Sequence, residues 1–181
     1  MAYTCHVEQG NLLLEENATF IVDASNTRLI LGSGVSAAFK EHCGPMLQQE
    51  MLEAYTKADT PIAQGSVIKT STGKATNFQY ALHAAVMNYN PGTRFKEKIP
   101  TLKTIKKILE NIETYLLQYA RENRQVIKLV LPLMGCGVGG LDKNDVIQEY
   151  KAFFERDVTF DCKVVVYGYD EEDYLLIRSI C

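Results

Sequence analysis

The sequence predicts an α/β layer structure built on a largely parallel sheet. Strand-like and helix-like segments alternate along all 181 residues. Several strand-like segments are short, continuous apolar runs, which are typical of strands buried on both faces. Two of them lead through glycine-rich turns, "LILGSGVSAAF" at 29–39 and "LPLMGCGVGG" at 131–140, toward helix-like segments. Composition shows no break, so residues 1–181 are expected to form a single domain.

The expected strands carry β-branched apolar runs or partial alternation and are bounded by turn residues. The run "ATFIVDA" is apolar enough for burial on both faces. A turn at Gly73-Lys74 is expected between the third and fourth segments. The six segments span 3–9, 18–24, 65–72, 80–89, 125–134 and 162–169.

Apolar residues at helical spacing mark the expected helices. The strongest pattern is a stripe from Leu102 to Tyr119 at steps of three and four residues, with lysines and glutamates on the solvated side. The first helix is expected to stop at Gly44-Pro45, and residues 90–98 read as a polar loop. The helical segments span 35–44, 46–58, 101–122, 143–155 and 170–180.

The charge balance argues against nucleic-acid and membrane-surface partners. The chain has 19 basic and 22 acidic residues and a net charge of −3, so it lacks the basic surface that such partners attract. No stretch approaches the roughly 18 apolar residues of a membrane-spanning helix, and the first ten residues lack a secretory pattern. We therefore expect a cytoplasmic protein in which local dipoles, rather than bulk charge, hold any anionic ligand.

The cysteine pattern favours free thiols. The number is odd, the spacing is wide, and no C-x-x-C pair occurs, so buried or partly buried thiols in a reducing compartment are expected rather than disulfides. The adjacent Cys and His residues point apart in a helix or strand, which disfavours a zinc site; no metal or cofactor is predicted. The five cysteines are Cys5, Cys43, Cys136, Cys162 and Cys181.

The two glycine-rich turns are the strongest functional signal. Glycine inside a strand or helix costs about 0.5–1 kcal/mol against alanine, so each cluster needs a local reason. The carboxyl ends of parallel strands meet at one edge of a sheet, where ligands bind. A glycine turn at a helix N-terminus presents unpaired N–H groups and a partial positive charge. We predict that the two turns converge on a diphosphate; the alternative is that each turn is merely tight.

Two further patterns have competing interpretations. Asn26, in "DASN" at a strand's carboxyl end, can accept from and donate to neighbouring sugar hydroxyls, or it can bond its own backbone in a turn. Residues 135–140 match the dinucleotide fingerprint G-x-G-x-x-G. The acidic residue expected about 20 positions later comes instead about 30 positions on, at Asp170, and no second mononucleotide half follows. A dehydrogenase is therefore disfavoured.

These motifs together resemble the macro domain family of ADP-ribose-binding modules. The stretch "VEQGNLLLEENATFIVDASNTRLILGSGVSAAFKEHCG" resembles the family's opening, with GD[IL]T, then V-N-A-A-N, then a G-G-G-V loop into a helix. "LPLMGCGVGGLDKNDV" resembles its second loop, and "VVVYGYD" resembles its last strand and exit. The resemblance spans nearly the whole chain. It implies a three-layer α/β/α sandwich around a mixed, largely parallel central sheet.

The resemblance also implies ADP-ribose lying across the carboxyl ends of the strands. Asn26 matches the amide that holds the distal ribose hydroxyls. Asn11, with Leu12 beside it, takes the place of the acidic residue that accepts from the adenine amino group. Tyr169 falls near the aromatic that packs against adenine. The loops that would offer N–H groups to the two phosphates are Gly32, Ser33, Gly34 and Val35, and Gly135, Cys136, Gly137, Val138 and Gly139.

Three departures from the family pattern are expected to change the site. Asn11 replaces an aspartate, which removes charge assistance from a bond to adenine. Asp23 replaces an asparagine; a buried carboxylate there needs donors or must protonate, and we interpret it as structural. Gly139 stands where many members carry a bulky tyrosine or phenylalanine over the phosphates, so a more open site is expected.

Ser36 bears on whether the protein is an enzyme. Hydrolytic members often have an aspartate here that arranges the attacking water, whereas serine is no base near neutral pH. The lysine-aspartate pair of another hydrolytic branch is also missing. The first prediction is therefore a module that binds ADP-ribose metabolites or mono-ADP-ribosylated protein. The alternatives are substrate-assisted hydrolysis of ADP-ribosyl esters, O-acetyl-ADP-ribose or ADP-ribose-1″-phosphate, and a fold kept for interactions alone.

His83 and Cys136 are the remaining candidates for catalysis. His83, in the strand-like "YALHAAV", is interpreted as a satisfied core histidine rather than a general base. Cys136 is predicted to lie at a helix N-terminus, where the pKa of a thiol falls. We expect it to offer its backbone N–H to a phosphate rather than to act as a nucleophile, and no residue is assigned a catalytic role.

Overall fold

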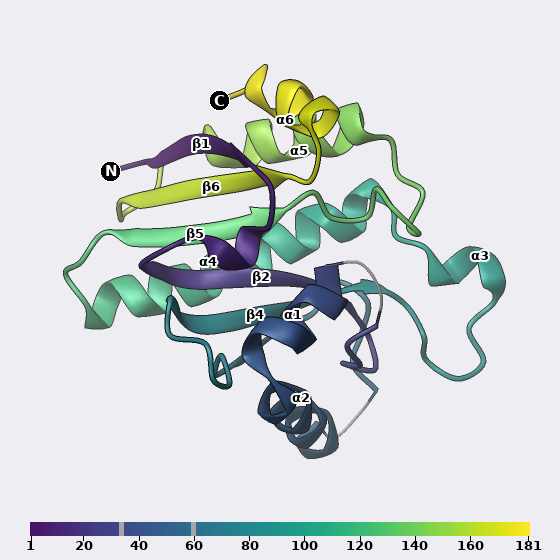
Figure 1. The fold of residues 1–181 in the computed structure, drawn as a ribbon. Helices are drawn as coiled ribbons and strands as arrows, with labels where there is room; N and C mark the ends of the chain where they lie inside the picture. Colours follow the sequence, from purple (N-terminus) through teal and green to yellow (C-terminus); the bar gives the residue numbers. More distant parts are fainter. Residues whose placement is uncertain (33–34, 59–60) are drawn as a thin grey trace.

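The central layer of the protein is a six-stranded mixed sheet (Figure 1). The computed structural model describes residues 1–32, 35–58 and 61–181. The strands are β1 (Tyr3–Gln9), β2 (Ala18–Asn26), β3 (Val67–Thr70), β4 (Phe78–Met87), β5 (Ile127–Pro132) and β6 (Cys162–Gly168). They lie in the order β1-β6-β5-β2-β4-β3, and every neighbouring pair is parallel except β3 with β4.

Two helices and a 3₁₀ turn cover one face of the sheet. They are α1 (Val35–Cys43), α2 (Pro45–Lys57) and η1 (Leu12–Leu14). The fully buried side chains of Phe39 in α1 and Leu47 in α2 belong to the same apolar core as Ile21 of β2. Burial of this face explains why the helical pattern continues past Gly44-Pro45, where α2 begins as a new helix with proline in its first turn.

The other face is covered by α4 (Leu102–Glu122), α5 (Lys143–Phe154) and α6 (Glu171–Arg178). The predicted stripe of α4 is buried against Phe20 and Val22, which alternate along β2 with the residues of the opposite core. The predicted three-layer α/β/α sandwich with a mixed, largely parallel sheet is therefore confirmed. Within the described parts of the chain, no helix has the length and apolar character needed to cross a bilayer.

Several local predictions need correction. The short helix α3 (Phe95–Lys98) lies in the segment predicted as a loop. The second glycine turn does not open a helix directly, because α5 begins at Lys143, after the N-cap Asp142 accepts a hydrogen bond from the backbone N–H of Asp145 at 3.1 Å. The glycines of this turn belong to a loop, and the helix dipole predicted for their N–H groups is absent.

The prediction of free thiols is wrong for one pair of cysteines. Cys5 of β1 and Cys181 form a disulfide across 176 residues of sequence. Helix α6 returns the chain beside β1, so the two termini lie close together (Figure 1). The spacing could not reveal this pair, because only the tertiary fold brings the ends together. Cys43, Cys136 and Cys162 are free and buried or partly buried, as predicted.

Candidate functional site

A cavity of about 420 Å³ lies at the carboxyl edge of the sheet, beyond the ends of β2, β4 and β5. Both glycine-rich turns line it, because β2 and β5 are adjacent parallel strands whose exits share one edge. None of the described lining residues carries a charge. Ser33 and Gly34 lie outside the described residues. The predicted residues that meet in the cavity are Asn26, Gly32, Val35, Gly135, Gly137, Val138 and Gly139.

The turn after β5 is a loop closed by its own backbone. The N–H of Leu141 donates to the carbonyl of Gly135 at 2.9 Å, and the N–H of Gly140 donates to the carbonyl of Gly137 at 3.1 Å. The N–H groups of residues 136–139 donate to no acceptor within the described chain. Successive free amides of this kind form a concave binding site for an anion.

Two glycines of this loop have different steric surroundings. A Cβ atom at Gly139 would lie 2.6 Å from the carbonyl oxygen of Gly135 and 3.0 Å from the ring of Pro100, so no side chain fits there. A Cβ atom at Gly137 would meet no atom within 4 Å. Gly139 is therefore required by the loop itself, whereas the missing side chain at Gly137 leaves the cavity open.

Asn26 holds the segment between β2 and the first glycine turn. Its Oδ1 accepts from the backbone N–H of Arg28 at 3.0 Å and of Ile30 at 3.4 Å, and its Nδ2 donates to the carbonyl of Ile30 at 2.9 Å. Both acceptor positions of the oxygen and one of the two amide hydrogens are thus engaged. The side chain is a turn asparagine that also lines the cavity, with one N–H left for a ligand.

A second amide, from α2, holds the same segment. The Oε1 of Gln48 accepts from the backbone N–H of Leu31 at 2.6 Å, and its Nε2 donates to the carbonyl of Leu29 at 2.9 Å. Leu29 has a φ of 54°, which is unusual for a residue other than glycine. Gln48 therefore stabilises a strained segment that leads into the first glycine turn, and sequence inspection did not single it out.

A buried chain of hydrogen bonds supports the floor of the cavity. The Ser36 hydroxyl, in the first turn of α1, donates to Asp23 Oδ1 at 3.0 Å. Asp23 Oδ2 lies 2.8 Å from Nδ1 of His83, and Nε2 of that ring lies 2.7 Å from the Thr70 hydroxyl. Asp23 and His83 are both fully buried. The interpretation of His83 as a satisfied core histidine is confirmed. Both oxygens of Asp23 are hydrogen-bonded, which is consistent with the structural role predicted for it.

The predicted adenine-binding residues lie at the same edge but do not line the cavity. Asn11 follows β1 and Tyr169 follows β6, and these two strands are parallel neighbours. The Asn11 side chain accepts from the N–H of Leu13 at 3.0 Å and caps η1. The Leu12 side chain is buried in the core, so it is not available to a ligand. Tyr169 is 84 % exposed, which leaves its ring free.

Cys136 is not an activated thiol. Burial raises its pKa to about 11, and its Sγ donates to the carbonyl of Met134 at 3.6 Å. The pKa depression expected at a helix N-terminus is absent because α5 begins only at Lys143. Its side chain does not line the cavity, whereas its backbone N–H belongs to the free amides of the second loop.

Comparison with known proteins identifies the family. The Macro domain model matches residues 22–150, which include the end of β2, all of β5 and both glycine-rich turns. This chain belongs to the Macro domain family.

Relatives of this Macro domain are distant in sequence and close in fold. An uncharacterized protein of Aquifex aeolicus is 28% identical over 165 residues, 88% of this chain and 87% of its own. The Oceanobacillus iheyensis macrodomain with ADP superposes with a TM-score of 0.74 at 19% identity, covering 97% of this chain and 88% of that one. A Trypanosoma brucei macrodomain in complex with ADP has a TM-score of 0.70 at 19% identity, over 97% of this chain and 68% of that one.

Ser25 is a polar residue of the cavity that the sequence analysis did not single out. Ser25 lines the cavity next to Asn26 and is 3% exposed, yet its hydroxyl has no hydrogen-bond partner among the described residues. The family pattern V-N-A-A-N has alanine at this position, so the serine in "VDASN" was a visible departure.

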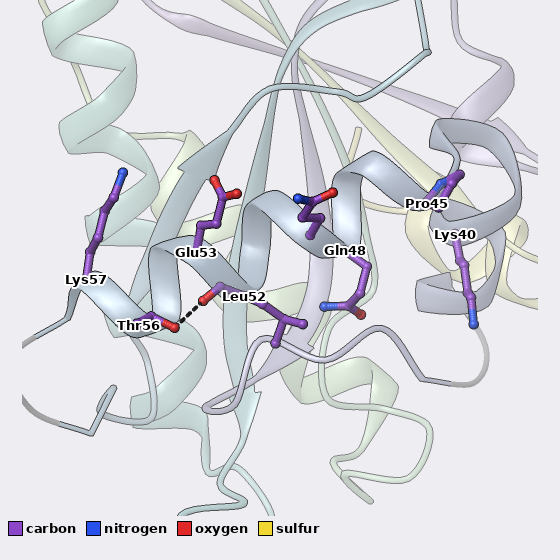
Figure 2. Close-up of a pocket in the computed structure, with 8 residues that line it drawn as sticks. Lys40, Pro45, Gln48, Leu52, Glu53, Thr56 and Lys57 are labelled. Carbon is purple, nitrogen blue, oxygen red and sulfur yellow. Dashed lines mark hydrogen bonds between the residues drawn. The ribbon is translucent and has the colours of Figure 1, made fainter.

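A second hollow, about 660 Å³ in volume, runs along the outer surface of α1 and α2 (Figure 2). Lys40, Glu53 and Lys57 line it together with Leu52, whose carbonyl accepts from the Thr56 hydroxyl at 2.9 Å. These are exposed helix side chains of mixed charge, and none of the predicted site residues is among them. The hollow is a solvated helix surface.

Among the described residues, no cluster of His, Cys, Asp and Glu is arranged to hold a metal ion.

Proposed function

We propose that this Macro domain binds ADP-ribose, as a free metabolite or attached to a protein, with the diphosphate between the two glycine-rich turns. One observation carries the proposal: both turns line one uncharged cavity, and the four amides of residues 136–139 have no acceptor in the described chain. A diphosphate satisfies such amides without a cationic side chain. The ADP bound in the Oceanobacillus iheyensis and Trypanosoma brucei macrodomains supports the same ligand class.

The strand order gives the proposed ligand a direction. The distal sugar lies beyond β2, where Asn26 has one free amide hydrogen and Ser36 lines the floor. The adenine lies beyond β1 and β6, where the ring of Tyr169 is exposed and Asn11 follows β1. The Asn11 oxygen already accepts one hydrogen bond within η1, so its bond to an adenine amine uses its remaining lone pair and lacks charge assistance.

Titration calorimetry with ADP-ribose, ADP, AMP and NAD tests this proposal. ADP-ribose and ADP are expected to bind because both carry the diphosphate, and ADP-ribose is expected to bind more tightly because only it reaches the end of β2. AMP, with a single phosphate, is expected to bind weakly. Absence of binding heat with both ADP-ribose and ADP would contradict the proposed function.

Hydrolysis is the second candidate, by water attack that the substrate's own phosphate assists. The open space at Gly137, which lines the cavity, leaves room for water. Both oxygens of the nearby Asp23 carboxylate are engaged, with Ser36 and His83, so it is not a free base. We therefore rank binding first. Incubation with a carboxyl-linked ADP-ribosylated protein separates the two: release above the level without protein supports hydrolysis.

A further inference from the structure

Ser25 has a hydroxyl group that the folded protein leaves unused. Its Oγ is buried and has no partner among the described residues. Buried hydroxyl groups are almost always hydrogen-bonded, because leaving water without a new partner costs stability. An unpartnered hydroxyl in the wall of a cavity therefore indicates that its partner arrives with a ligand.

The position of Ser25 in β2 directs its side chain toward the α1 side of the sheet. Side chains alternate along a strand, and Ile21 and Asp23 on the same strand pack against the α1 side, Asp23 through the hydroxyl of Ser36. Ser25 continues this row by one step, to the carboxyl end of the strand, and lines the cavity there together with Ser36.

The polar groups around Ser25 are already committed to other partners. The Ser36 proton and the two Asp23 oxygens are used in the hydrogen bonds of the cavity floor. The Asn26 oxygen accepts two backbone N–H groups. No described neighbour offers an acceptor to the Ser25 proton, whereas the oxygen of Ser36 retains lone pairs that can accept from a ligand.

We propose that Ser25 is a specificity-determining residue that hydrogen-bonds a hydroxyl group of the ligand's distal sugar. This assignment rests on the proposed function. The floor offers a neutral donor at Ser25 and a neutral acceptor at Ser36, with the Asp23 carboxylate behind them and no cation in the described lining. Such a floor suits an uncharged polyol and disfavours a phosphate, which instead lies against the free amides of the loops.

The test compares Ser25→Ala with the wild type by calorimetry and thermal melting. ADP-ribose is expected to bind about fivefold to tenfold more weakly, the loss of one hydrogen bond between neutral groups. ADP, which lacks the distal sugar, is expected to bind within twofold of the wild type. The free variant is expected to melt about 2–4 °C higher because an unpartnered buried hydroxyl has been removed. Ser25→Cys, with a weaker donor in nearly the same shape, is expected to change ADP-ribose binding in the same direction.

Thr19→Val is the matched control, because Thr19 is a buried hydroxyl residue at the other end of the same strand. Its Oγ1 accepts from the N–H of Lys128 at 3.1 Å. The control is expected to melt lower than the wild type and to bind both nucleotides unchanged. Unchanged ADP-ribose binding by Ser25→Ala, or equal losses for ADP-ribose and ADP, would overturn the assignment while the proposed function stands. A wild type that binds neither nucleotide overturns both.

Discussion

A side chain at residue 137 would extend into open space at the second loop. We expect Gly137→Val to weaken ADP-ribose binding by about 1.4 kcal/mol or more, a tenfold rise in Kd, because its methyl groups enter the space above amides 136–139. The fold is expected to persist, since a Cβ at this glycine meets nothing within 4 Å. Calorimetry gives the Kd, and a thermal melt checks the fold.

Gly139→Ala is the matched control for this variant. Its Cβ would lie 2.6 Å from the carbonyl oxygen of Gly135, so the loop itself must distort. A lower melting temperature is expected for Gly139→Ala and an unchanged one for Gly137→Val. If Gly137→Val binds ADP-ribose as tightly as the wild type, the phosphates do not lie against this loop.

At the scale of residues, prediction succeeded where chemistry alone fixes the outcome. A carboxylate and an imidazole in apolar strands need partners, and Asp23 and His83 supply each other. Prediction failed where the outcome depends on distant parts of the chain. The two hydrogen bonds of Gln48 and the unpartnered hydroxyl of Ser25 could not be predicted from local sequence spacing. Each depends on which element packs over β2.

At the scale of elements, α2 holds the segment that leads into the first glycine turn through one side chain, Gln48. We expect Gln48→Ala to raise the Kd for ADP-ribose about threefold to tenfold, because the strained segment around Leu29 loses both of its bonds to α2. Hydrogen exchange at the Leu31 amide, which donates to Gln48, is expected to become faster. Calorimetry and exchange measured by mass spectrometry check the two effects.

Gln49→Ala is the matched control for this element. Gln49 is the next residue of α2, but it is exposed and does not line the candidate cavity. The control is expected to leave both the Kd and the exchange of Leu31 unchanged. Equal behaviour of the two variants would show that α2 does not support the turn.

Elements with a continuous apolar stripe were predicted to within a residue or two. The expected helix at 101–122 is α4, Leu102–Glu122, because its buried face alone decides its extent. For the second glycine-rich turn, the predicted source of anion binding, a helix N-terminus, was wrong. Asp142 caps α5 only after the glycines have ended, so the proposed anion site there depends on loop amides. Only the order of strands brings this loop beside the first turn.

At the scale of the whole molecule, three buried or partly buried thiols are expected to make the stability of the fold sensitive to alkali. Burial raises the pKa of Cys43 and of Cys136 to about 11, and that of Cys162 from 9.0 to about 12. The folded state therefore holds these protons more tightly than the unfolded state. Their contribution to stability is complete below about pH 9 and is lost as pH rises toward about pH 12.

Cys162→Val tests this pH dependence. The variant removes the thiol whose pKa is raised furthest among the three and keeps an apolar residue in β6. Its free energy of unfolding is expected to fall less steeply than that of the wild type between pH 8 and pH 11, by on the order of 2 kcal/mol. Urea unfolding at both pH values measures the difference. Parallel pH profiles for the two proteins would contradict the expectation.

The disulfide between Cys5 and Cys181 has a practical consequence for how the protein is handled. Strand β1 starts at the amino edge of the sheet, and α6 brings the last residue back beside it, so both ends lie away from the edge where the cavity opens (Figure 1). A sensor chip, a bead or a fluorescent fusion attached at either terminus is expected to leave the cavity facing solvent. Both termini therefore offer attachment points on the side of the molecule opposite the cavity.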